Sequence, residues 1–147
     1  MADLVSTQIL QNGDRYAIVK FTNYSDGTGE SAVTKIDATS GGSYGVFIGG
    51  RTFYPGVNLK VRRVWYDVKN MGLQILWHAT SDVDAFVLGG YGTFDFRDFG
   101  GVSVPTGVTG ITGSIDFTAV PIAGVGTGGV TAGYTVVLEI SKGIPQS

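Results

Sequence analysis

The segment VNLKVRRVWYDVKNMGLQILWHAT, residues 57–80, contains the features that decide the fold. It includes both tryptophans and the longest run rich in apolar, β-branched and aromatic residues. Asn70-Met71-Gly72 divides it into two strand-like arms, and arms joined by a short segment that ends in glycine are typical of a β-hairpin. We therefore predict a central hairpin with its turn at 70–72.

Apolar side chains in both arms alternate as they do in a strand that buries one face. In the second arm they occupy every other position from 73 to 79. In the first arm the alternation changes phase at Arg62-Arg63. A β-bulge at this point keeps both apolar sets on the core side, so we predict one there. We also expect Trp77 to be buried and Trp65 to be at least partly covered.

The composition indicates one all-β domain. The chain has 147 residues, of which 43% are hydrophobic and only 15% charged, which argues against disorder. Its 24 glycines indicate many turns, and no window is typical of an amphipathic helix. We predict a single jelly-roll-like β-sandwich of about eight or nine antiparallel strands with glycine-rich loops.

Further strands are expected on both sides of the central segment. Residues 1–12 form either an extended arm or a short edge strand, and the glycine-rich segments 100–113 and 121–133 form loops. The other strands are predicted at 14–24, 32–38, 46–54, 86–94, 114–119 and 134–141. We expect the strands at 14–24 and 32–38 to pair as a hairpin.

Charge and cysteine content exclude several classes of protein. The formal net charge is −2 with acids and bases dispersed, so we expect no nucleic-acid partner. There are no cysteines, which excludes disulfides and thiolate chemistry. No apolar stretch reaches the roughly 18 residues of a membrane helix, and the start lacks a secretory pattern. We expect synthesis in the host cytoplasm and no membrane partner.

Four patterns resemble functional motifs but lack the context that the chemistry needs. Asp98-Phe99-Gly100 matches the kinase magnesium triplet without the rest of that signature, and 124–129 matches G-x-G-x-x-G without a following helix. His78 is the only histidine, and we expect no companion ligands for it. Residues 25–30, SDGTGE, lack most ligands of a calcium loop. The sequence predicts no enzyme activity, no catalytic residue, no cofactor and no metal.

Several segments together resemble small structural proteins of tailed bacteriophages. The resemblance covers nearly the whole chain, from about residue 5 to 142, in the expected order. The segments are RYAIVKFTNYSDGTGE (15–30), VTKID (33–37), VWYD (64–67), NMGL (70–73), ILWHAT (75–80), FDFR (94–97) with GG (100–101), TGSIDFT (112–118) and YTVVLE (134–139). Some capsid cement, or decoration, proteins are similar small β-sandwiches. The resemblance implies a non-enzymatic virion component.

We therefore expect a capsid cement protein that stabilises the head shell. We expect it on the capsid surface as a homo-oligomer, and its partner is the major capsid protein or other virion proteins. One alternative is a neck or tail adaptor or fibre-base module. Another is a carbohydrate-binding module that stacks sugars on Trp65, Tyr66 and Tyr91.

Partner contacts are expected on the arm, on the uncharged apolar loops and on the one basic cluster. Large uncovered apolar surface is unusual on a monomer, and arginine is favoured at interfaces. For Arg62 and Arg63, an ordinary solvated strand face is an equally good interpretation. The predicted partner-binding residues are Val5, Ile9, Leu10, Arg62, Arg63, Val102, Val104, Val108, Ile111, Val125 and Val130.

Overall fold

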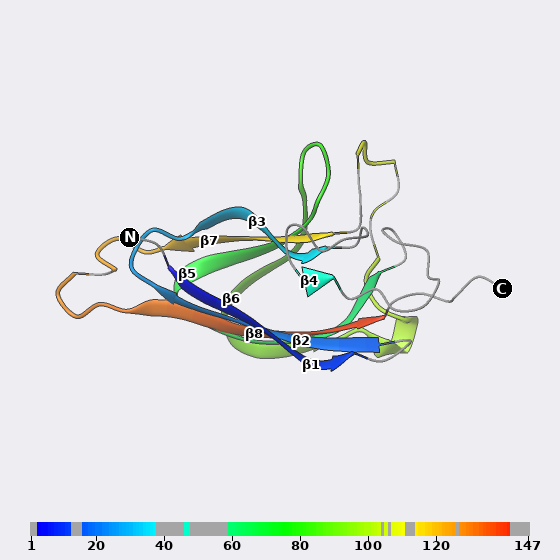
Figure 1. Cartoon of the computed structure of the whole chain (residues 1–147), viewed down its shortest axis with the longest axis horizontal. Helices are drawn as coiled ribbons and strands as arrows, with labels where there is room; N and C mark the ends of the chain where they lie inside the picture. Colours follow the sequence, from blue (N-terminus) through cyan, green and yellow to red (C-terminus); the bar gives the residue numbers. More distant parts are fainter. Residues whose placement is uncertain are drawn as a thin grey trace.

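The computed structural model describes residues 3–12, 16–37, 46–47, 59–103, 105, 107–110, 114–125 and 127–141 (Figure 1). The strands are β1 (Leu4–Asn12), β2 (Tyr16–Ser25), β3 (Glu30–Asp37), β4 (Val46–Phe47), β5 (Lys60–Trp77), β6 (Val83–Asp95), β7 (Ile115–Pro121) and β8 (Ala132–Ser141). A single 3-10 turn, η1 (Arg97–Phe99), is the one helical element in these ranges. No helix found there is long and apolar enough to cross a membrane. The prediction of an all-β chain is confirmed.

The eight strands form one sheet in the order β1-β2-β8-β5-β7-β3-β4, and β6 pairs with the other side of β5. All pairs are antiparallel except β3 with β4, which is parallel, so the prediction of a wholly antiparallel sheet is wrong at that pair. The predicted hairpin of 14–24 with 32–38 is also wrong. β2 pairs with β1 and β8, whereas β3 pairs with β7 and β4.

β5 is the organising strand, but it is not a hairpin. It runs without interruption from Lys60 to Trp77, and its turn to β6 falls at 78–82 instead of 70–72. At Asn70 the backbone takes a left-handed conformation, with φ of 56°, and the strand bends. Before the bend β5 pairs with β8, and from Met71 it pairs with β7. The Asn-Met-Gly segment therefore redirects a strand from one partner to another.

Contacts from other strands explain why this segment does not close a turn. The Asn70 side-chain amide donates to the carbonyl oxygen of Thr131 at 2.7 Å, and its own carbonyl accepts from the amide of Ile122 at 3.0 Å. These contacts tie the bend to the ends of β7 and β8. Tertiary partners therefore supply the hydrogen bonds that a tight turn would make locally.

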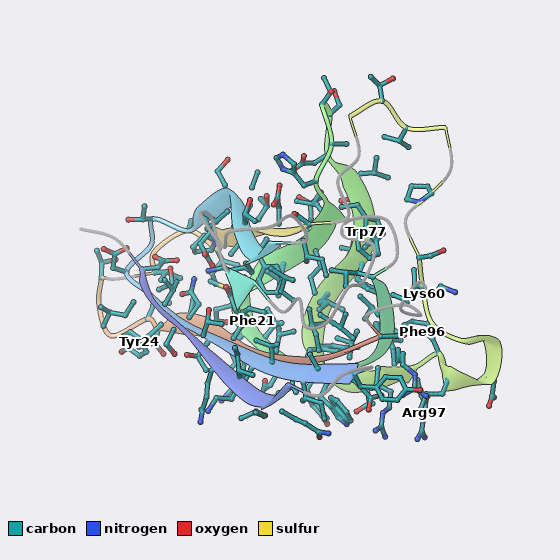
Figure 2. All side chains as sticks on the ribbon, turned by 45° about the vertical axis from the view of Figure 1, so that its right-hand side comes forward. Phe21, Tyr24, Lys60, Trp77, Phe96 and Arg97 are labelled. Atoms are coloured by element: carbon teal, nitrogen blue, oxygen red, sulfur yellow. The ribbon has the colours of Figure 1, made fainter. Side chains whose placement is uncertain are left out.

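The sheet curls so that β3 and β7 lie over β2 and β8, as Figure 1 shows. Phe117 of β7 contacts Phe21 of β2 and Tyr134 of β8, with ring centroids 5.0 and 5.8 Å apart. These strands are not neighbours in the sheet, so the contacts are made across the interior of the curl. Figure 2 shows Phe21 between the two parts of the sheet.

The core confirms the predicted face of β5. Trp77 is 1% exposed, and Trp65 on the opposite face is half-buried. The bulge is also where it was predicted: Val61 lies opposite Ile140 and Arg63 opposite Glu139, which leaves Arg62 as the extra residue. The largest fully buried side chains are Trp77, Phe21, Phe117, Ile36, Leu73, Ile75, Ile115, Leu138, Ile140, Val19 and Val61.

Candidate functional site

The edge strand β1 is the clearest candidate for an interaction site. It pairs with β2, and no other described strand covers its outer edge. Leu4, Val5, Ile9 and Leu10 are 74%, 48%, 43% and 50% exposed. An open edge strand with exposed aliphatic side chains is a template for pairing with another chain. The prediction that 1–12 is either an arm or an edge strand is resolved here as an edge strand from Leu4 to Asn12.

The register places these side chains on both faces of the sheet. Val5 lies opposite Asn23 and therefore on the inner face, as does Ile9. Leu4 lies opposite Tyr24 on the outer face, where Tyr24 is itself 60% exposed. Leu10 is the extra residue where the β1–β2 register shifts. A partner that paired with this edge would therefore cover apolar surface on both faces.

Asp3 fixes the start of β1 to the turn between β2 and β3. Its Oδ1 accepts hydrogen bonds from Ser25 Oγ at 2.9 Å and from the amides of Asp26 and Gly29 at 3.2 and 3.1 Å, and its Oδ2 accepts from Asn23 Nδ2 at 3.0 Å. The turn therefore directs donors at a carboxylate. This arrangement of donors suits an anionic group.

A second carboxylate continues this network beneath the surface. Glu30 accepts hydrogen bonds from Asn23 Nδ2 at 2.9 Å and from the Tyr134 hydroxyl, and its other oxygen contacts Lys35 Nζ at 2.5 Å. Burial raises the pKa of Tyr134, and the hydrogen bond to Glu30 raises it further. The network joins β2, β3 and β8 and, through Asn23, reaches Asp3, so the start of the edge strand is held in place.

More exposed apolar residues lie at the same end of the molecule. Val120, Ile122 and Val130, around the β7–β8 connection, are 62%, 51% and 37% exposed. Figure 1 places this connection beside the chain's N-terminal end and the β2–β3 turn, and Figure 2 shows Tyr24 at that end. Strand parity identifies Tyr24 as outward-facing, and it also places Val120 on the face opposite to Phe117 and Ala119.

The predicted loop residues fall in different environments. Val130 is exposed, and Val108 is half-buried. Val102 forms a bridge with Val61 and packs against the core. Val125 is 7% exposed and belongs to the core, so its assignment to a partner surface is wrong. A glycine-rich loop can turn one apolar residue inward, and composition alone does not show which one. Val104 and Ile111 lie outside the described residues.

Arg62 and Arg63 contact groups of their own chain. Arg63 donates to both oxygens of Glu139, at 2.9 and 3.0 Å, and Arg62 lies 3.5 Å from the same carboxylate. Their guanidinium groups also lie over Tyr16 and Trp65, 4.4 and 4.8 Å from the ring centroids. The hydrogen bond from Arg63 lowers the pKa of Glu139. These contacts favour a structural role over a docking patch for both arginines.

The three aromatic residues of the carbohydrate alternative do not form one platform. Trp65 and Tyr91 lie on the outer face of β5 and β6, but the Trp65 ring is covered by Arg63. Tyr66 lies on the opposite face and stacks on Phe94 with centroids 5.5 Å apart. A sugar therefore has no continuous aromatic surface in this region.

His78 lies beside two carboxylates, whereas the sequence predicted no companion ligands for it. It directly follows β5, and its Nδ1 lies 2.7 Å from Asp116 Oδ2 of β7 and 3.7 Å from Asp82 Oδ1. Burial raises the pKa of Asp116, which is 1% exposed, and the hydrogen bond to Asp116 raises the pKa of His78. Residues distant in sequence meet here because β5 pairs with β7, which no spacing rule reveals.

The remaining motifs have ordinary structural roles. Asp98 of the kinase-like triplet is an exposed residue of η1, and the described part of the G-x-G-x-x-G segment connects two strands, β7 and β8.

A scan against models of known protein families found no match for the chain. A search of curated protein sequences found none either. The phage resemblance therefore stays a prediction.

Proposed function

We propose that this protein is a non-enzymatic structural component of a tailed-phage virion, a capsid cement protein that binds the assembled shell as a homo-oligomer. In this proposal the curled sheet is a jelly-roll-like sandwich that acts as a rigid body. The observation that supports it best is β1, an open edge strand with four aliphatic residues at least 43% exposed.

A fixed edge strand suits assembly because little conformational entropy is lost when a partner pairs with it. Asp3 and the network around Asn23 hold the start of β1 in its extended form before any partner arrives. A shell then presents many identical sites, so modest contacts of each protomer add up to firm retention by avidity. The exposed Val120, Ile122 and Val130 offer further contact area at the same end.

The position of the protein in the particle tests the cement assignment. Quantitative mass spectrometry of purified virions should find copies on the order of hundreds, as expected for a component repeated over a shell. A count of about a dozen or fewer would instead assign the protein to the neck or tail, and absence from the particle would refute the virion assignment altogether.

The contact surface can be tested on its own by blocking the edge. Val5→Lys and Ile9→Lys place charge on β1, which opposes strand pairing between chains. Both should lower the mass measured by light scattering and weaken co-sedimentation with shells that lack the protein. Thr135→Lys is the matched control, because Thr135 is exposed but lies within β8, away from any edge. Equal effects of all three substitutions would refute the β1 contact.

A further inference from the structure

We propose that His78, Asp82 and Asp116 form a binding site for a divalent transition-metal ion of the zinc class. One ligand atom from each residue lies within 4.8 Å of the others. The site would tie the β5–β6 turn to β7. It is independent of the virion proposal, and it is tested on the isolated chain.

Two elements, the β5–β6 turn and β7, bring the ligands together. His78 follows the last residue of β5, Asp82 precedes the first residue of β6, and Asp116 is the second residue of β7. His78 is anchored by its own backbone, since its amide donates to the Ser114 carbonyl at 2.8 Å. The hairpin turn and the β5–β7 pairing thus place all three side chains at one corner of the sheet.

Groups outside the cluster orient both carboxylates. Thr34 Oγ1 of β3 donates to Asp116 Oδ1 at 2.7 Å, which leaves Oδ2 directed at the imidazole. The amide of Ala79 donates to Asp82 Oδ1 at 3.1 Å. Hydrogen bonds of this kind hold metal ligands in position and are a regular feature of metal sites.

The charge balance favours a divalent cation. Asp116 is 1% exposed, and Asp82 has a side chain 19% exposed, so both carboxylates are largely removed from water. Among the residues that the structure describes, His78 is the single cationic partner found for the pair. One imidazolium leaves a net negative charge in a partly buried place, which is costly. A divalent ion with neutral imidazole neutralises both carboxylates.

The ligand set and geometry indicate the class of ion. Zinc binds imidazole nitrogen and carboxylate oxygen at about 2.0–2.2 Å, so neighbouring ligand atoms lie about 3–3.5 Å apart. The observed 2.7 and 3.7 Å from His78 Nδ1 require only small shifts. Imidazole favours zinc and related ions over magnesium and calcium, which prefer oxygen ligands alone. The His78 side chain is 46% exposed, which gives the ion a path from solvent.

Thermal unfolding of the tag-free chain tests the site. At a zinc concentration about 100-fold above Kd, binding to the folded state should raise Tm by about 5 °C or more, whereas magnesium and calcium should have little effect. His78→Gln and Asp82→Asn should remove the zinc-dependent shift. Asp84→Asn is the matched control, because Asp84 is an exposed acid of the same hairpin that lies outside the cluster, and it should keep the shift.

Nuclear magnetic resonance gives a second readout that does not depend on stability. His78 is the only histidine, so one imidazole spin system reports on the site without assignment. Zinc should deprotonate Nδ1 and move its ¹⁵N resonance, while Nε2 keeps its proton. If the Nδ1 resonance is unchanged in excess zinc, or if His78→Gln retains the Tm shift, the cluster is an ordinary hydrogen-bonded ion pair and the proposal is wrong.

Discussion

At the scale of single residues, buried groups of the protein are matched to specific partners. Glu139 illustrates this, because it is only 6% exposed yet carries a charge. Two hydrogen bonds from Arg63 and the nearby Arg62 compensate for its lost hydration. Without them the carboxylate would be costly to bury, so the bulge that brings both arginines to one side of β5 also stabilises β8.

The Glu139 carboxylate should make stability depend on pH. Because Arg63 lowers its folded-state pKa, the carboxylate contributes stability above the usual glutamate value of about 4.3 and loses it as pH falls through the lower folded value. Glu139→Gln should therefore lower Tm at pH 7, and the difference from wild type should shrink below about pH 4. Thr135→Ala, at an exposed position of β8 without a titratable group, should show no such trend. A Tm difference that stays constant with pH would contradict this account.

Trp77 should be the most costly aromatic residue to truncate. It is 1% exposed in the interior of the curl, so Trp77→Ala should lower the free energy of unfolding by about 3–5 kcal/mol in denaturant titrations. Tyr91→Ala provides the comparison. Tyr91 is 85% exposed, and its truncation should change stability by about 0.5 kcal/mol or less. A loss below about 1 kcal/mol at Trp77 would show that the residue is not in the core.

At the scale of elements, local pattern predicted strand faces well and strand connections badly. The bulge at Arg62 followed from parity, because each side chain's face depends on its neighbours in sequence. The bend at Asn70 did not, because its carbonyl and side chain bind Ile122 and Thr131, which lie far away in sequence at the two ends of the β7–β8 connection. The cluster at His78 was missed for the same reason, since Asp116 reaches it through strand pairing.

The bend in β5 should depend on the left-handed conformation of Asn70, with φ of 56°. Asn70→Gly and Asn70→Ala both remove the hydrogen bond to Thr131, but glycine adopts this conformation freely and alanine does not. Asn70→Ala should therefore be less stable than Asn70→Gly by about 1–2 kcal/mol. Equal free energies of unfolding for the two variants would mean that the backbone conformation is not under strain.

At the scale of the whole molecule, the curled sheet buries its central strands and leaves its edge strands open to pairing with another chain. The inner faces of β2, β3, β7 and β8 enclose the aromatic core. Among the described strands, β1, β4 and β6 each have one paired neighbour, and β4 has only two residues. The two long edge strands, β1 and β6, differ in the residues that they expose. β1 has aliphatic side chains on both faces, while β6 exposes Val87 and Tyr91, at 69% and 85%, on either side of Gly89-Gly90. The start of β1 is held in its extended form by Asp3, which favours this edge for association.

We expect β1 to pair with β1 of a second copy around a two-fold axis, the commonest symmetry of homo-oligomers. If the two copies of β1 overlap along their full length, the two-fold axis passes beside Gln8, the middle residue of Leu4–Asn12. The chain has no cysteine, so Gln8→Cys places a single thiol near the midpoint of β1. Under mild oxidation it should form a disulfide-linked dimer, because Cα atoms in paired strands lie about 4.5–5.5 Å apart, within reach of a disulfide. Thr135→Cys, exposed in the middle of β8, should stay monomeric on a non-reducing gel. The absence of a disulfide-linked dimer of Gln8→Cys, or equal cross-linking of both variants, would show that β1 does not pair with itself in this register.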